Sequence, residues 1–223
     1  MIADPFITES IQKGETVLLE KMLEENPSLA DSTTREGLSL LLFALYCGRA
    51  KDGAAVELIK RYKPSLDCYE AVCLGEFAKL TQNLDQNPGL INIPSIDGFS
   101  LLGYACFFNQ PAIAGYLVEK GADVNSASAN SFKVTPLHSA AAISNYSLVK
   151  MLVENGADVD ARQQAGFTAL HAAADHGATE IITLLLEKGA DVEAKTDAGE
   201  TALSIAEKKH QPEAAGLIRS YMK

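Results

Sequence analysis

The chain has 223 residues, enough for one large domain or two small ones, and 47% of them are apolar, which is enough to build a core. Its formal net charge of −10 and pI of about 4.9 argue against nucleic acid or an anionic membrane surface as partner, because those surfaces bind Lys and Arg. The longest apolar run, residues 40–47, is far shorter than the roughly 20 residues of a membrane helix. We expect a globular protein with no membrane and no nucleic-acid partner.

The first ten residues contain neither a basic start nor an apolar stretch, so we expect no signal peptide. No C-x-x-C pair and no matching His spacing occurs among the four cysteines, Cys47, Cys68, Cys73 and Cys106. We therefore predict a cytoplasmic protein whose reduced thiols are small buried apolar groups.

In the N-terminal part, Pro-containing segments end predicted helices: N-P-S-L at 26–29, K-P-S-L at 63–66 and N-P-G-L at 87–90. The sequence E-G-L-S-L-L at 36–41 is similar to D-G-F-S-L-L at 97–102, which lies 61 residues later. This separation is slightly less than two units of the repeat described next. We therefore predict a shortened unit between them that has lost its hairpin turn near 64–70.

The C-terminal part repeats itself. The motif G-A-D-V occurs at 121–124, 156–159 and 189–192, and T-P-L-H at 135–138 returns as T-A-L-H at 168–171 and T-A-L-S at 201–204. A period of 33 to 35 residues is typical of a solenoid, in which each unit buries its apolar face against its neighbours.

Each unit is predicted to contain two antiparallel helices and a turn. Thr135 and Thr168 are placed to cap a short Ala-rich helix, and Pro136 suits the first helical position. Residues 180–188 have the apolar spacing of a second helix. A left-handed glycine is expected to end that helix, at Gly189 and at the same place in the earlier motifs, Gly121 and Gly156.

These residues closely resemble the ankyrin repeat family. Unit 163–195 carries the family pattern at Gly166, Thr168, Leu170, His171, Ala173, Ala174, Gly177, Gly189, Ala190, Asp191 and Val192. Unit 130–162 fits as well, except that Lys133 and Ser144 replace two glycines. The resemblance implies an all-α ankyrin-repeat solenoid of stacked helix-turn-helix units with β-hairpin-like loops.

We count seven units in one ankyrin-repeat domain spanning 1–223: 1–33, 34–66, 67–94, 95–129, 130–162, 163–195 and 196–223. Residues 1–94 are the divergent repeats and include the N-terminal cap. Residues 95–195 are the typical repeats, and 196–223 form the C-terminal capping repeat.

Three residues close together, His171, Asp175 and His176, have the spacing of a metal or acid–base site. The resemblance gives His138 and His171 a structural role instead, in which each hydrogen-bonds around its helix start. Ser204 holds the equivalent position in the last unit and is expected to lack that contact. Since no third ligand or nucleophile is found, we predict no enzyme activity, no catalytic residue, no metal and no cofactor.

The resemblance also implies a concave binding surface formed by the hairpin tips and the inner helices. The residues that we assign to partner binding are Phe99, Phe107, Phe108, Phe132, Val134, Ile143, Phe167, Asp175 and His176. Exposed aromatic side chains are typical of interface hot spots. The alternative is that Phe99, Phe107 and Phe108 fill a gap beside the shortened unit as ordinary core.

The leading prediction is a non-enzymatic scaffold or adaptor that binds another protein and is itself a monomer, with weak self-association left open. One alternative is an inhibitor that masks a partner enzyme or effector. A second alternative is that Asn125, which follows G-A-D-V, is the substrate of an asparagine hydroxylase.

Overall fold

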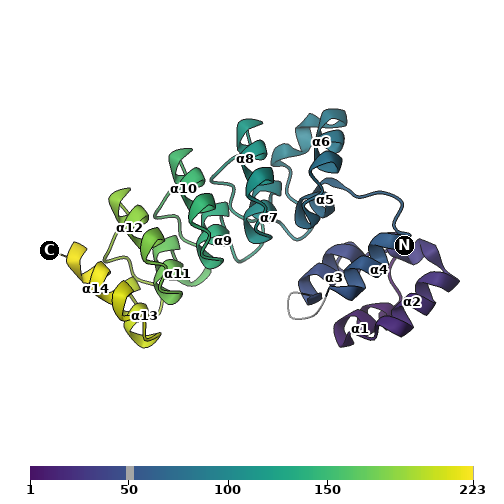
Figure 1. Ribbon diagram of the computed structural model, residues 1–223, viewed down its shortest axis with the longest axis horizontal. Helices are drawn as coiled ribbons and strands as arrows, with labels where there is room; N and C mark the ends of the chain where they lie inside the picture. Colours follow the sequence, from purple (N-terminus) through teal and green to yellow (C-terminus); the bar gives the residue numbers. More distant parts are fainter. Residues whose placement is uncertain (49–52, 223) are drawn as a thin grey trace. The chain divides into compact units, whose positions relative to one another are not determined.

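The computed structural model describes residues 1–48 and 53–222, and the chain divides into two compact units, Met1–Asn83 and Leu84–Lys223. The described residues form fourteen α-helices in seven successive pairs (Figure 1). They contain isolated β-bridges, such as Lys195 with Thr201, but no strand. None of the described helices is long and apolar enough to cross a membrane. The all-α prediction is confirmed.

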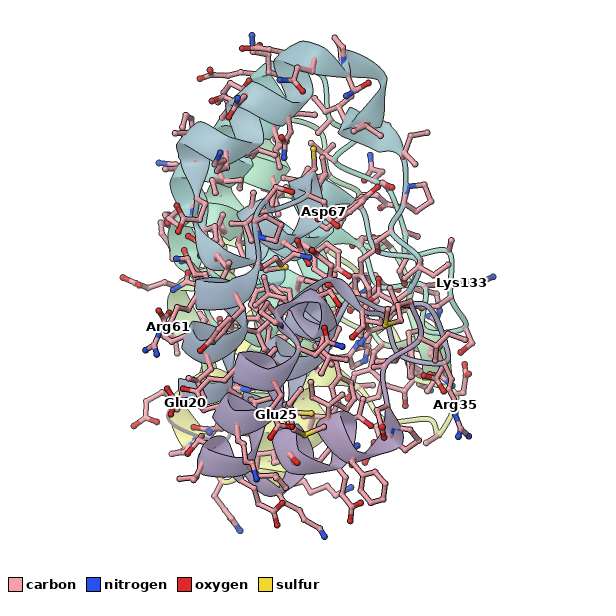
Figure 2. All side chains as sticks on the ribbon, turned by 90° about the vertical axis from the view of Figure 1, so that its right-hand side faces the viewer. Glu20, Glu25, Arg35, Arg61, Asp67 and Lys133 are labelled. Carbon is pink, nitrogen blue, oxygen red and sulfur yellow. The ribbon has the colours of Figure 1, made fainter. Side chains whose placement is uncertain are left out.

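The first unit is built from α1 (Pro5–Lys13), α2 (Thr16–Glu25), α3 (Leu40–Gly48), α4 (Ala54–Tyr62), α5 (Cys68–Leu74) and the start of α6 (Phe77–Gln86). Helix α3 packs on α1 and α5, and α4 packs on α2. Their facing sides supply a core that includes Ile7, Leu19, Leu23, Leu40 and Ile59. On the outside, Glu20 and Arg61 form an exposed ion pair at 3.1 Å and project on the same side (Figure 2).

The third helix pair lacks a hairpin turn, as the sequence predicted, because α4 ends at Tyr62 and α5 begins at Cys68. The buried side chain of Lys63 lies in this short connection, with Nζ 2.9 Å from Asp31 Oδ1 and 3.4 Å from Glu70 Oε1. Asp67 and Glu70 form a capping box at the start of α5. A partly buried ionic cluster of Lys63, Asp31 and Glu70 therefore lies where other units have a turn.

The Pro-containing segments differ from one another. N-P-S-L and N-P-G-L continue into the 3₁₀ helices η1 (Pro27–Asp31) and η2 (Pro88–Asn92). Residues 63–66 do not form a 3₁₀ helix and run directly towards α5. The predicted equivalence of the three segments thus holds only for the first and the third.

The second unit contains four helix pairs: α7 (Leu101–Phe107) and α8 (Pro111–Glu119), α9 (Pro136–Ala142) and α10 (Tyr146–Glu154), α11 (Ala169–Asp175) and α12 (Thr179–Glu187), and α13 (Ala202–Lys208) and α14 (Pro212–Tyr221). A short 3₁₀ helix, η3 (Gln164–Gly166), precedes α11. The first helices of the pairs pack side by side in an inner layer, and the second helices form an outer layer (Figure 1).

Small residues set the close spacing of the inner layer. Ala140, Ala141, Ala173 and Ala174 are completely buried, so that neighbouring inner helices can approach closely. Leucines at the stacking positions, namely Leu137, Leu152, Leu170 and Leu185, are buried between the layers. The helix pairs therefore share one continuous apolar core.

Left-handed residues close the turns. Gly121, Gly156 and Gly189, which end the outer helices, have φ of +91°, +89° and +91°. Lys133 and Ser144, which replace family glycines, also have positive φ, of +51° and +55°. The backbone thus keeps the left-handed conformation at two positions where a side chain makes it costly.

Three side chains join successive repeats across the boundaries between the third and the sixth helix pair. Asn125 Nδ2 donates to the carbonyl of Gly156 at 3.0 Å, and Asn125 Oδ1 accepts the N–H of Asp158 at 2.8 Å. Asn92 makes the same two bonds one repeat earlier, at 3.2 and 2.9 Å. Asp160 accepts the N–H of Asp191 at 2.9 Å one repeat later. We call Asn92, Asn125 and Asp160 the ladder residues.

Candidate protein-binding surface

Four aromatic side chains at the start and end of α7 form one cluster. The ring centroids of Phe99 and Phe107 lie 6.3 Å apart, and those of Phe107 and Phe108 lie 5.2 Å apart in an edge-on arrangement. Tyr104 is fully buried beneath them, 5.6 Å from Phe99 and 6.1 Å from Phe108. The three phenylalanines are each half-buried, so they pack on one another and still present part of each ring to solvent.

A hydrogen-bonded turn positions this cluster. The N–H of Ser95 donates to the carbonyl of Phe99 at 2.9 Å, and Ser100 caps α7 by accepting the N–H of Gly103 at 3.0 Å. The phenol of Tyr104 donates to Asp97 Oδ1 at 2.5 Å. Because this hydrogen bond holds the Tyr104 ring in place, the phenylalanines that pack on that ring are held in place as well.

The next repeat adds apolar side chains. Phe132 is 55% exposed at the tip of its turn, and its N–H donates to Asn130 Oδ1 at 3.0 Å. Val134 and Ile143 are half-buried. The carbonyl of Phe132 accepts the N–H of Gln164 at 2.8 Å, which connects this turn to the following one.

Phe167 occupies the equivalent turn of α11 and is half-buried, with its ring centroid 5.6 Å from that of His171. Asp175 and His176 lie at the end of α11. Asp175 Oδ1 is 2.9 Å from Lys209 Nζ, and His176 Nδ1 donates to the carbonyl of Ala172 at 3.0 Å. These three positions extend the surface to the last repeat.

The spacing of His171, Asp175 and His176 does not produce a site. His171 is completely buried, whereas His176 is exposed. The carboxylate of Asp175 forms an ion pair with Lys209. Among residues 1–48 and 53–222, no group of three His, Cys, Asp or Glu side chains is arranged to hold a metal ion.

The buried histidines join neighbouring repeats. Nδ1 of His138 accepts the N–H of Thr135 at 3.2 Å and lies 2.7 Å from its hydroxyl, so the proton is on Nε2, which donates to the carbonyl of Phe167 at 3.2 Å. His171 repeats this arrangement with Thr168, and its Nε2 faces the carbonyl of Ala194 at 3.1 Å. Burial lowers the pKa of both imidazoles below the ordinary 6.5, an effect that the carbonyl contacts oppose.

The expectation that Ser204 lacks this contact is wrong. Ser204 Oγ accepts the N–H of Thr201 at 2.9 Å, and the N–H of Ser204 donates to Thr201 Oγ1 at 3.2 Å, which completes a capping box. A hydroxyl can perform the local part of the role of His. The hydrogen bonds of Ser204 are local to its helix start, whereas His138 and His171 also bond a carbonyl of the following repeat.

The ionic cluster of Lys63, Asp31 and Glu70 was not predicted. The carboxyl of Glu70 is buried, and burial raises its pKa, with the Asp67 carboxylate adding to the effect and Ser39, Lys63 and the Asp67 backbone opposing it. Burial opposes the charge of Lys63, but the Asp31 and Glu70 carboxylates raise its pKa overall. The sequence D-C-Y-E at 67–70 carries a capping-box signature, which indicates where α5 begins but gives no sign of the ion pairs with Lys63.

Comparison with known proteins agrees with this geometry. A family model described as "Ankyrin repeats (3 copies)" matches residues 7–163 and 137–221. Ankyrin repeat and SAM domain-containing protein 6 of Rattus norvegicus is 33% identical over 103 residues, which are 46% of this chain and 12% of that protein. Target of rapamycin complex 2 subunit AVO2 of Saccharomyces cerevisiae is 28% identical over 167 residues, 70% of this chain and 39% of that protein.

E3 ubiquitin-protein ligase hecd-1 of Caenorhabditis elegans is 29% identical over 135 residues, which are 60% of this chain and 5% of that protein. The chain thus spans less than half the length of each of these relatives. Ankyrin repeats act as protein–protein interaction modules and are generally not enzymes. With seven helix pairs in the described residues and a family match over nearly its whole length, the chain belongs to the ankyrin repeat family.

Proposed function

We propose that this protein is a non-enzymatic adaptor whose second unit binds an apolar or amphipathic segment of another protein. The observation that carries the proposal is the partly exposed cluster of Phe99, Phe107 and Phe108, together with the exposed ring of Phe132 in the next repeat. Aromatic side chains that are rigidly held and partly open to solvent contribute strongly to interfaces, because burying them on binding needs little ordering. We define this set, continued by Val134, Ile143, Phe167, Asp175 and His176, as the aromatic surface.

The polar end of the aromatic surface gives the partner segment a direction. Asp175, His176 and Lys209 lie at the end where the phenylalanines give way to charged residues. An amphipathic segment would place its apolar side chains on the repeats of α7 and α9 and a charged residue near α11 and α13. Charges at the rim of an interface affect specificity and association rate more than affinity.

Affinity capture from native lysate, read by mass spectrometry, tests the proposal with two variants. One combines Phe99→Ser, Phe107→Ser and Phe108→Ser; the other is Phe132→Ser, which removes an exposed ring and leaves the core intact. The control is Phe6→Ser combined with Phe77→Ser, because both rings are exposed and belong to the first unit. Circular dichroism first verifies that each variant is folded.

We expect a partner that the wild type and the control retain and that both aromatic-surface variants lose. A partner retained by both folded variants would exclude the aromatic surface as its binding site. Titration of the purified partner then measures the loss, which we expect to be about tenfold or more for the triple variant.

The inhibitor alternative is distinguished by the partner's own activity. If the chain masks an enzyme or effector, that activity falls on binding and recovers with the Phe132→Ser variant. An adaptor leaves it unchanged. Modification of Asn125 remains a separate proposal, and intact mass of protein from its native source would show one added oxygen atom.

We also propose a monomeric protein of a reducing compartment such as the cytoplasm. The four cysteines support this assignment, since none of them forms a disulfide in the part of the chain that the structure describes and all but Cys47 are buried. Burial also raises the pKa of the Cys106 thiol, which keeps it protonated and unreactive.

A further inference from the structure

The turn before α3 in the first unit and the turn before α7 in the second have equivalent backbones. The N–H of Thr34 donates to the carbonyl of Leu38 at 2.7 Å, and the N–H of Ser95 donates to the carbonyl of Phe99 at 2.9 Å. Counting from these turns, the two segments correspond residue by residue at a separation of 61 positions. Thr34 therefore corresponds to Ser95, and each later residue of α3 has a counterpart in α7.

In the second unit, this turn binds a phenol hydroxyl. Tyr104 donates to Asp97 Oδ1 at 2.5 Å, and the Ser95 hydroxyl lies 3.3 Å from the Tyr104 hydroxyl and also bonds Asp97. The three polar groups satisfy one another in a buried place. A serine and an acidic residue are thus sufficient to bind the phenol hydroxyl of a tyrosine at this turn.

In the first unit, the same positions are Thr34, Glu36 and Phe43, so the turn and the acid are present but the phenol hydroxyl is not. Thr34 Oγ1 is buried without a hydrogen-bond partner. The hydroxyls at the corresponding position of other repeats are used: Ser128 donates to Asn130 at 2.8 Å, and Thr196 accepts the N–H of Glu200 at 3.1 Å.

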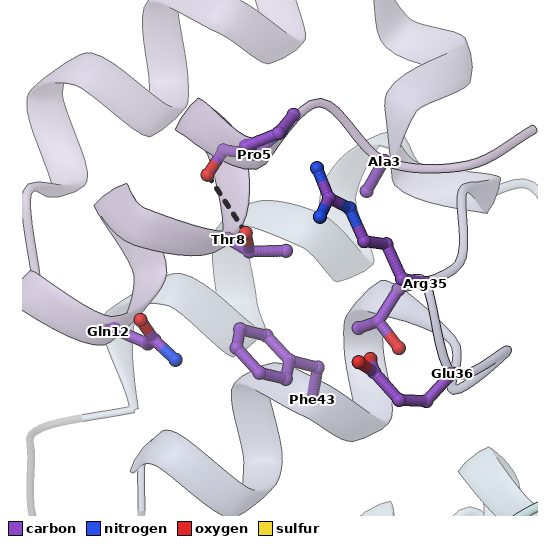
Figure 3. Close-up of a pocket in the computed structure, with 8 residues that line it drawn as sticks. Ala3, Pro5, Thr8, Gln12, Arg35, Glu36 and Phe43 are labelled. Atoms are coloured by element: carbon purple, nitrogen blue, oxygen red, sulfur yellow. Dashed lines mark hydrogen bonds between the residues drawn. The ribbon is translucent and has the colours of Figure 1, made fainter.

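A cavity of about 320 Å³ lies at this turn, between α1, the turn and α3. Its lining includes Thr34, Arg35, Glu36 and Phe43. Figure 3 shows the Glu36 carboxylate directed towards the side of the Phe43 ring, while the guanidinium of Arg35 reaches across towards α1. The volume is at the small end of the range for ligand pockets, roughly 300 to 1,000 Å³, and suits one side chain.

We propose that this cavity binds the phenol side chain of a tyrosine from a partner protein. The tyrosine ring would pack on Phe43 and beneath the guanidinium of Arg35, and its hydroxyl would donate to the Glu36 carboxylate, as Tyr104 does to Asp97. Arg35 and Glu36 together carry no net charge, so a cationic side chain would gain Glu36 but meet Arg35, and an anionic one would gain Arg35 but meet Glu36. A neutral aromatic hydroxyl satisfies both, and the site is independent of the aromatic surface of the second unit.

The test is binding of N-acetyltyrosinamide to the full chain, followed by protein-observed NMR, with N-acetylphenylalaninamide as the probe that lacks only the hydroxyl. We expect saturable shifts at the amides of Thr34, Glu36 and Phe43 and at least about tenfold weaker binding of the phenylalanine probe, because a hydrogen bond to a carboxylate is lost. Equal affinity for the two probes, or shifts elsewhere only, would overturn the proposal.

Two variants define the site. Phe43→Tyr places a hydroxyl in the cavity from within the chain; it should abolish tyrosine binding and raise the Tm by about 2 to 4 °C through the gained hydrogen bond. Glu36→Gln should weaken tyrosine binding about tenfold and leave the weak phenylalanine binding unchanged, and it decides the question if the first variant does not fold. Unchanged tyrosine binding in Glu36→Gln contradicts the proposal.

A third probe, p-cresol, separates a protein side chain from a free phenol. Binding of both p-cresol and N-acetyltyrosinamide supports a tyrosine of a polypeptide. Binding of p-cresol alone would show that the cavity excludes the peptide backbone, which overturns the assignment to a partner protein.

Discussion

Asn125 Oδ1 accepts a hydrogen bond of 2.8 Å from the N–H of Asp158, across the boundary between two repeats. Its amide also donates to Gly156, so one side chain supplies two bonds between successive helix pairs. Replacing it by Ala should lower the free energy of unfolding by about 1 to 2 kcal/mol, because two exposed hydrogen bonds are lost. Urea denaturation followed by circular dichroism measures this change.

The matched variant is Asn125→Asp, which keeps the acceptor and loses the donor, as at Asp160. We expect about half the loss seen with Ala. If Asn125→Asp and Asn125→Ala lower the free energy of unfolding equally, the bond to Asp158 contributes nothing to stability, and the ladder does not couple the repeats.

Buried histidines should make the second unit sensitive to acid. The pKa of His138 and His171 is lowered in the folded chain, mainly by burial, so the unfolded chain binds more protons in the window below about 6.5. Their contribution to stability is therefore complete above that pH and is lost as the pH falls towards the lowered pKa. Unfolding curves between pH 7.5 and about 5 measure the slope.

Replacing both histidines by Gln should flatten this slope, whereas His176→Gln should not, because His176 is exposed at the end of α11. A wild-type curve that is flat below about pH 6.5 would contradict the buried neutral imidazoles.

Glu70 should make the stability of the first unit depend on pH with the opposite sign to that of the two histidines. Its pKa is raised in the folded chain, mainly by burial, so the folded chain binds more protons than the unfolded chain between the ordinary value of 4.5 and the raised value. Stability from this group is complete below the unfolded pKa and is lost as the pH rises through the folded pKa. Glu70→Gln keeps the capping geometry and should remove this part of the slope.

The readout is a probe confined to the first unit, such as exchange at the amides of α5, measured from pH 4.5 to 7.5. Asp31→Asn is the control, since its exposed carboxylate also pairs with Lys63 but is not buried. An identical slope in wild type and Glu70→Gln would show that Lys63 compensates the Glu70 charge fully.

Ser144 has a left-handed backbone with φ of +55°, at the position that Gly177 occupies with φ of +65° in the next repeat. A residue with a Cβ pays a steric cost there that glycine does not. We expect Ser144→Gly to raise the free energy of unfolding by about 0.5 to 1 kcal/mol, less than the full steric cost because glycine is more flexible when unfolded. The reverse change, Gly177→Ser, should destabilise, because a residue with a Cβ is strained at φ of +65° and the side chain of Gln211 would also have to move aside.

The repeats, their helices and the histidine caps could be predicted because each depends on residues within one period. T-P-L-H fixes a local cap, and G-A-D-V fixes a turn whose glycine has positive φ. The ladder was not predicted, because the sequence marks Asn125 only as a candidate modification site, and its bonds to Gly156 and Asp158 come from the structure. The residues that form these caps and turns recur in several units, so one sequence contains several copies of each pattern.

The exposure of the aromatic rings could not be predicted, since it depends on how neighbouring side chains share space. Phe99, Phe107 and Phe108 are neither ordinary core nor fully open, because Tyr104 takes the buried place beneath them. The ionic cluster at Lys63 was missed for a related reason. It depends on Asp31, a residue 32 positions earlier that no period links to Lys63.

The ladder also predicts an order in which the repeats of the second unit open. Asn92 and Asn125 each supply two bonds to the following repeat, whereas Asp160 supplies one. In a chain of nearest-neighbour contacts, the end with the weaker links frays first. Amide hydrogens of α13 and α14 should therefore exchange with solvent before those of α9 and α10, so that the charged end of the aromatic surface loosens while the phenylalanine cluster stays folded.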